Sequence, residues 1–158
     1  LNGKVFNIYK FRSMIVDAEK DGKSQPATDH DPRITPVGRV LRATRLDELP
    51  QLIDILIGNM SLVGPRPERI EHVDKYSEDI PEFKYRLKVR GGLTGYAQLY
   101  GKYNTSPYDK LQLDLIYIQN YSIFLDIRLI FMTLKIMFMK ESTEGFSEQQ
   151  KNELQEKR

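Results

Sequence analysis

The 158-residue sequence contains no cysteine, which excludes disulfide frameworks and thiolate chemistry and fits a reducing compartment. It also has little excess of either charge, because 24 lysines and arginines stand against 22 acidic residues, a net charge of +2. A balance this close argues against a nucleic-acid partner, so any anion-binding site must be local. The apolar (40%) and charged (29%) fractions exclude collagen-like, low-complexity and wholly disordered classes.

Several common catalytic and nucleotide-binding motifs are absent as well. The sequence has no G-x-x-x-x-G-K-[ST], G-x-G-x-x-G, G-x-S-x-G or H-E-x-x-H, which excludes the common nucleotide-binding, hydrolase and zincin classes. His30 and His72 lie far apart, without the spacing of a metal cluster, and we interpret both as surface residues.

The length favours a single domain. We expect a domain over residues 1–140 and a flexible polar tail over 141–158, with a loop at 17–31 that has almost no apolar residue. Asn2-Gly3 is the preferred dipeptide of a type I′ hairpin turn, and residues 5–12 are rich in β-branched and aromatic types. We therefore expect a strand at 5–12 whose partner lies upstream, in a longer parent chain.

Helical signals dominate the rest of the sequence. Thr35 is a good N-cap, Pro36 suits the first helical position, and Asp47 is the expected N-cap of the next helix, which Gly58-Asn59 would end. Residues 87–96 combine basic residues with glycines and other turn-forming residues, which predicts a loop or short hairpin. We expect helices at 36–45, 47–57, 68–85, 110–120 and 122–140, and an α+β fold that is mainly helical with a small antiparallel β element.

The predicted helix at 122–140 has two apolar stripes on nearly opposite sides. One consists of Ile127, Phe131, Leu134 and Phe138, and the other of Leu125, Leu129, Met132 and Ile136. Charged residues interrupt the segment too often for it to span a bilayer. Either the helix is buried between layers, or one stripe faces a membrane or a partner.

The pair Asp47-Glu48 is the first candidate for chemistry, although an Asp before a helix is most often only a cap. Arginines follow one another at intervals of three upstream (Arg39, Arg42, Arg45), and Arg66 is held stiffly between two prolines downstream. Because a guanidinium matches phosphate oxygens, carboxylates beside arginines are typical of a phosphoryl-transfer site. Each arginine taken singly fits a solvated helix face better than a site.

Lys10 and Arg12 would share one face of the predicted strand, where they could serve a site or only protect a sheet edge. Arg90-Gly91-Gly92 is similar to an anion-cradling loop, but a tight turn can use the same residues.

Five blocks in a fixed order closely resemble the bacterial sugar transferase family, the monotopic phosphoglycosyl transferases, over about residues 3–140. The blocks are VFNIYKFRSM (5–14), DPRITPVGR (31–39), LR (41–42) through RLDELPQL (45–52), SLVGPRPE (61–68) and KVRGGLTGYAQ (88–98).

The resemblance implies a transfer of sugar-1-phosphate from a nucleotide diphosphate sugar, expected to be a UDP-sugar, to polyprenyl phosphate. The reaction would start bacterial glycan synthesis at the cytoplasmic face of the inner membrane. By resemblance, Asp47 is the nucleophile that forms a covalent aspartyl phosphosugar, and Glu48 helps to hold Mg²⁺. Lys10, Arg42, Arg66 and Gln98 correspond to phosphate or substrate contacts.

The sequence departs from the family pattern in three ways. Arg90-Gly91-Gly92 replaces the usual Arg-Pro-Gly, Tyr96 replaces a Trp, and the family's N-terminal apolar re-entrant helix is absent. We expect the upstream segment to restore stable membrane association and acceptor use. Two alternatives stay open, a non-catalytic nucleotide-sugar-binding module and a membrane-surface interaction domain, and so does assembly into a homo-oligomer.

Overall fold

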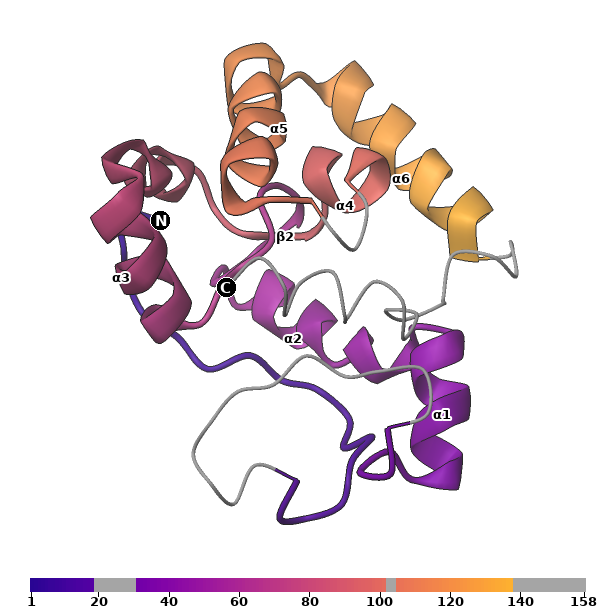
Figure 1. The fold of residues 1–158 in the computed structure, drawn as a ribbon. Helices are drawn as coiled ribbons and strands as arrows, with labels where there is room; N and C mark the ends of the chain where they lie inside the picture. The colour runs from indigo at the N-terminus through magenta and orange to yellow at the C-terminus, as the bar shows by residue number, and fades with distance from the viewer. Residues whose placement is uncertain (19–30, 102–104, 138–158) are drawn as a thin grey trace.

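The computed structural model describes residues 1–18, 31–101 and 105–137 (Figure 1). Helices make up most of it, which confirms the mainly helical prediction. In chain order the elements are α1 (Pro36–Ala43), the 3-10 turn η1 (Leu46–Glu48), α2 (Gln51–Leu56), β1 (Ser61–Val63), α3 (Ile70–Asp79), the 3-10 helix η2 (Pro81–Lys88), β2 (Gly92–Thr94), α4 (Tyr96–Tyr100), α5 (Pro107–Asn120) and α6 (Ile123–Met137).

The sheet of β1 and β2 is parallel, so the predicted antiparallel element and the hairpin at 87–96 are wrong. Ser61 pairs with Gly92 and Val63 with Thr94. The helices α3 and η2 lie between the two strands in sequence and form the crossover that a parallel pair requires. The backbones approach closely here, because a Cβ on Gly92 would lie 2.1 Å from the Gly64 nitrogen. Gly91-Gly92 therefore allows β2 to approach and pair with β1, and the chain does not reverse direction there.

The N-terminal segment is extended, but the strand predicted at 5–12 is wrong. The Asn2-Gly3 turn is present, with φ of 54° and 76° and a hydrogen bond from the Lys4 amide to the Leu1 carbonyl (3.1 Å). Residues 5–12 belong to no strand of the described structure, and two of their backbone amides donate to helical segments instead. The Tyr9 amide donates to Asp54 Oδ2 (3.0 Å) and the Phe11 amide to the Asp47 carbonyl (2.9 Å).

The helix α1 begins as predicted, since the Gly38 amide donates to Thr35 Oγ1 at 2.9 Å and Pro36 takes the first position. The prediction that Asp47 caps the next helix is wrong. Asp47 lies inside the 3-10 turn η1, and α2 begins only after Pro50, which has no amide proton to leave unpaired. Gly58 ends this region in a left-handed conformation, with φ +83°, as predicted.

The predicted helix at 68–85 is divided in two at Ile80. Pro81 disfavours helical backbone in the residue before it, so α3 ends there and the tighter η2 follows. The helix predicted at 110–120 begins earlier, at Pro107, where Ser106 caps it. Phe83 of η2 and Leu111 of α5 are fully buried, as are Met60 and Leu129, so the core lies between the crossover and the C-terminal helices.

The two stripes of α6 meet different surroundings. Leu129 is fully buried and packs with Val63 and Tyr117, whereas Phe131 is 67% exposed, with Ile127 and Leu134 also exposed. Phe138 lies outside the described residues, as do most of the predicted loop (19–30) and the predicted tail. None of the helices in the described ranges is long and apolar enough to cross a membrane.

Candidate functional site

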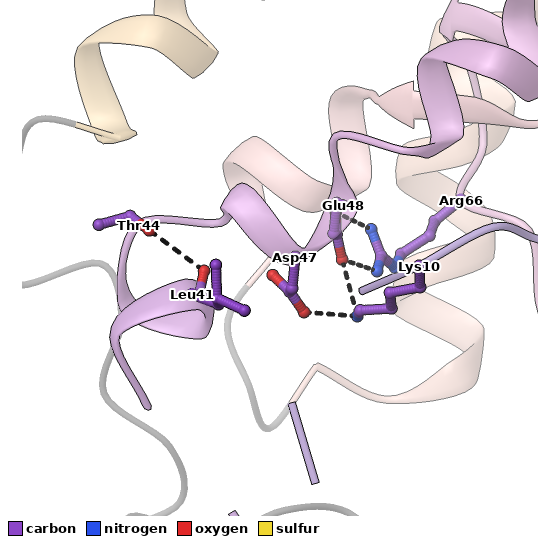
Figure 2. A network of polar contacts seen from close by, with 6 residues as sticks. All are labelled: Lys10, Leu41, Thr44, Asp47, Glu48 and Arg66. Atoms are coloured by element: carbon purple, nitrogen blue, oxygen red, sulfur yellow. Dashed lines mark hydrogen bonds and ion pairs between the residues drawn. The ribbon is translucent and has the colours of Figure 1, made fainter. Parts of the chain in front are cut away.

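Four of the six predicted site residues meet at one place (Figure 2). Lys10 comes from the extended N-terminal segment, Asp47 and Glu48 from η1, and Arg66 from the loop after β1. Lys10 Nζ lies 3.0 Å from Asp47 Oδ2 and 3.3 Å from Glu48 Oε1. Arg66 grips Glu48 with both ends of its guanidinium, Nη1 donating to Oε2 at 3.2 Å and Nη2 to Oε1. Two carboxylates and two cations therefore form one network.

Local backbone geometry presents the carboxylates to the cations. Arg45 has a left-handed φ of 56°, which ends the path of α1 and turns the chain into η1. Asp47 is only 4% exposed as a result. On the other side, Pro65 and Pro67 fix φ on both sides of Arg66 and limit where its side chain can begin.

The pKa values follow from this arrangement. Burial alone would raise the pKa of Glu48, but the hydrogen bonds and charges of Arg66 and Lys10 outweigh it and lower the pKa to about 2. For Arg66, burial works toward a lower pKa, and the Glu48 carboxylate outweighs it and raises the pKa above its ordinary value. Glu48 is therefore ionised at neutral pH.

Lys10 is positioned by hydrogen bonds on both of its backbone neighbours. The amide of Tyr9 donates to Asp54 and the amide of Phe11 to the Asp47 carbonyl. Asp54 is fully buried on α2, and its carboxylate also accepts from Asn59 Nδ2 at 3.5 Å. These two backbone hydrogen bonds form a clamp on Lys10, and one of them ends on the backbone of Asp47 itself.

Arg66 is supported from behind by a buried ion pair that the sequence analysis did not identify. Arg86 Nη2 donates to the Arg66 carbonyl at 2.9 Å, and its Nε and Nη2 donate to Asp114 Oδ2 at 3.0 and 2.7 Å. Arg86 is 3% and Asp114 1% exposed. Burial raises the pKa of Asp114, against the opposing effect of Arg86. The partners lie 28 positions apart, on η2 and α5, and no local sequence signal marks them.

The other two predicted site residues lie elsewhere. Arg42 belongs to the last turn of α1, and within the described residues no hydrogen bond or ion pair joins its side chain to the four-residue network. Gln98 lies on α4 and lines a cavity whose wall also includes Glu48. Arg12, which was predicted to share a strand face with Lys10, is exposed and is not one of the four residues of the network.

A magnesium ion fits this site only with help from a substrate. In the part of the chain that the structure describes, no three or more His, Cys, Asp or Glu residues group together as a metal centre. Asp47 and Glu48 supply two carboxylates, however, and Mg²⁺ usually binds one or two carboxylates together with water and substrate phosphates. The donor set suits a metal that arrives with a phosphorylated substrate.

Asp47 is the carboxylate best placed to react. One of its oxygens, Oδ2, contacts Lys10, whereas Figure 2 shows the other turned away from the cation. Beside positive charge, such a carboxylate can attack an electrophile that the same cations bind. Phosphate oxygens are the groups that an arginine and a lysine hold best.

The fold and the network together define a small, mainly helical α+β domain with a carboxylate pair facing two cations. Residues 1–140 match the family described as bacterial sugar transferase. The chain belongs to this family, as its resemblance at the motif level indicated.

Relatives that are named for an activity agree with this assignment. The chain is 45% identical over 133 residues (82% of the chain) to a UDP-N-acetylgalactosamine-undecaprenyl-phosphate N-acetylgalactosaminephosphotransferase of Aeromonas hydrophila. It is 43% identical over 147 residues (90%) to a UDP-glucose:undecaprenyl-phosphate glucose-1-phosphate transferase of Klebsiella pneumoniae. It is 38% identical over 155 residues (89%) to an undecaprenyl-phosphate galactose phosphotransferase of Salmonella typhimurium. The matches cover 31%, 31% and 32% of these relatives, so the chain spans about a third of their length.

The low pKa of Glu48 predicts how the stability of the domain changes in acid. Because the folded pKa, about 2, lies below the ordinary 4.5, the ion pairs contribute fully above about pH 4.5 and are lost as the pH falls toward 2. Glu48→Gln should remove this part of the pH dependence of the free energy of unfolding, measured by urea denaturation. Glu82→Gln, at an exposed position of η2, is the control. Parallel pH profiles for the wild type and Glu48→Gln would contradict the assignment.

Proposed function

We propose that this domain transfers a sugar-1-phosphate from a nucleotide diphosphate sugar, a UDP-sugar, to polyprenyl phosphate and thereby starts the assembly of a bacterial glycan. The observation that carries the proposal is the Asp47 carboxylate, buried, partly engaged by Lys10 and next to the Arg66–Glu48 pair. The activities for which the relatives in three organisms are named support the substrate classes.

In the first step, the free oxygen of Asp47 attacks the phosphorus that carries the sugar. The bond from this phosphorus to the bridging oxygen of the diphosphate breaks, and uridine monophosphate leaves with the electron pair. The aspartyl phosphosugar that forms keeps its negative charge beside Lys10 and Arg66, which offset the charge that accumulates on the phosphoryl oxygens.

In the second step, a phosphate oxygen of the polyprenyl phosphate attacks the same phosphorus. The acyl-phosphate bond breaks, the Asp47 carboxylate is regenerated, and the product is a polyprenyl diphosphate sugar. Dividing the reaction in this way avoids a direct attack of one weakly nucleophilic phosphate on another while both are bound.

Glu48, with Asp47, would hold Mg²⁺ together with the donor diphosphate. The ion would supply positive charge at the transferred phosphoryl group and the leaving group. Glu48 has two roles in this proposal, because the same carboxylate also orients Arg66 through its paired hydrogen bonds.

We propose that the domain works at the cytoplasmic face of the bacterial inner membrane. Apolar side chains are exposed along α6, with Phe124 82% and Phe131 67% exposed, and Leu52, Leu56 and Ile57 are exposed on and after α2. Exposed apolar surface of this kind suits burial at a lipid interface, where a lipid-linked acceptor is found.

Replacement of the nucleophile tests the reaction. Asp47→Asn keeps an oxygen that Lys10 can contact but cannot form the acyl phosphate, so turnover should fall by about 10³-fold or more. The measurements are release of uridine monophosphate from a panel of UDP-sugars and the mass of the intact protein, which should rise by one phosphosugar in the wild type only. Asp109→Asn, at an exposed position of α5, is the control. A wild type that binds the donor without releasing monophosphate would support a binding module instead.

The metal role of Glu48 predicts a shifted magnesium requirement. An amide oxygen is a poorer ligand for a hard dication than a carboxylate, so Glu48→Gln should need a higher Mg²⁺ concentration for half-maximal monophosphate release. Glu82→Gln should titrate as the wild type does. An unchanged half-maximal concentration in Glu48→Gln would remove Glu48 from the metal shell.

The membrane proposal predicts that α6 binds lipid. The chain should float with vesicles of phosphatidylethanolamine and phosphatidylglycerol, and Phe124→Glu with Phe131→Glu should abolish flotation. Tyr108→Glu alters an exposed aromatic residue of α5 and should leave flotation unchanged. A wild type that stays with the dense fraction, or a double variant that floats equally well, would refute a lipid-facing α6.

A further inference from the structure

A cavity of about 110 Å³ adjoins the carboxylate pair. It lies between the η1 turn on one side and β2, α4 and α6 on the other, and Glu48 forms part of its wall. Apolar cavities of similar size, about 150 Å³, take a single aromatic ring in other proteins. Most of the lining side chains are aliphatic: Leu49, Leu93, Leu99, Ile136 and Met137.

Gln98 is the unusual member of this wall. Both polar atoms of its side chain, Oε1 and Nε2, are buried and have no hydrogen-bond partner among the described residues. Leaving a buried amide unpaired destabilises the fold, and few native groups remain so. The side chain lies against Gly95, where a Cβ would come within 2.7 Å of Oε1. Because residue 95 is a glycine, the side-chain amide of Gln98 has room to lie against it.

The two threonine hydroxyl groups of the cavity wall already donate their hydrogen bonds within the protein. Thr133 Oγ1 donates to the Leu129 carbonyl at 2.8 Å, so in its 2.6 Å contact with Thr94 Oγ1 the proton comes from Thr94. Among the neutral polar side chains of the cavity, the Gln98 amide therefore has both a donor and an acceptor to offer.

We propose that this cavity holds the pyrimidine base of the nucleotide donor and that the Gln98 amide pairs with the edge of that base, an inference that rests on the proposed function. The N3–H of a uracil ring donates to Oε1, and its O4 accepts from Nε2. An amide pairs with a base edge through two such bonds in nucleic-acid recognition too. The aliphatic walls contact the two faces of the ring.

Other parts of the substrates fit this cavity less well. A sugar ring brings several hydroxyl groups, which would lie unpaired against Leu93, Leu99 and Ile136. A polyprenyl chain suits the aliphatic walls but leaves the Gln98 amide without a partner. A purine needs room for a second ring. A single-ring base satisfies both the walls and the amide.

The location also suits a nucleotide. Glu48 belongs to the cavity wall and to the Lys10–Arg66 network, so a base in the cavity brings its diphosphate toward Asp47. Arg45, the left-handed residue before η1, lines the same cavity and adds positive charge at this end of the site. Base recognition and phosphoryl transfer thus share the η1 turn.

Calorimetric titration of the chain with three probes tests the inference. We expect uridine monophosphate to bind about tenfold or more tightly than ribose 5-phosphate, which lacks the base, and more tightly than adenosine monophosphate. Gln98→Leu keeps a similar volume without the amide and should remove most of the preference for uridine monophosphate. Its affinity for ribose 5-phosphate should not change. Because Gln98→Leu removes an unpaired buried amide, its thermal stability without ligand should equal or exceed that of the wild type.

Leu93→Phe is a second variant, which fills the cavity and leaves Gln98 in place. It should weaken uridine monophosphate and spare ribose 5-phosphate. Equal binding of these two probes by the wild type would overturn the inference, as would an unchanged preference in Gln98→Leu or equal binding of adenosine monophosphate. A Gln98-dependent preference for uridine monophosphate in a chain that never releases it from UDP-sugars supports the base site and refutes the transferase proposal.

Discussion

The parallel pairing of β1 with β2 is the constraint on which the site depends. In a parallel pair the carboxyl ends of both strands lie at the same edge. Arg66 follows β1 and Gln98 follows β2, so the arginine of the network and the amide of the cavity both lie on one side of the domain. An antiparallel pair would send them to opposite ends. The close approach at Gly64 and Gly92 makes this pairing possible, because a side chain at Gly92 would strike the facing backbone.

Short sequence motifs contain the residues of the network, Lys10, Asp47, Glu48 and Arg66. These residues could therefore be predicted as site candidates without knowledge of the fold. Two adjacent carboxylates and an arginine between prolines are recognisable without a fold, and Lys10 is a candidate both from its place on the predicted strand and from the family resemblance. Gln98 is indicated by the resemblance alone, whereas Arg42 also belongs to the arginine series upstream of Asp47. Among the described residues no hydrogen bond or ion pair joins Arg42 to the network, whereas Gln98 lines a cavity beside it.

Other features could not be predicted because their causes are distant in sequence. The Gly91-Gly92 signal is typical of a tight turn, and only the crossover through α3 and η2 makes it a strand entry. Asp47 was expected to cap a helix, but the left-handed Arg45 places it inside a 3-10 turn instead. The supporting pair of Arg86 and Asp114 joins two elements that no local periodicity connects.

The clamp on Lys10 has a consequence for the charge of the site. With Lys10 in place, two carboxylates face two cations, and their formal charges cancel. Lys10 lies in an extended stretch outside both strands of the sheet, and this stretch is held near the site through the amides of Tyr9 and Phe11. Segments held by so few bonds open locally at a lower free energy than the core does. Each such opening leaves Asp47 and Glu48 facing Arg66 alone, with a formal charge of minus one. The attraction of the site for a cation therefore rises whenever the N-terminal segment that carries Lys10 is released.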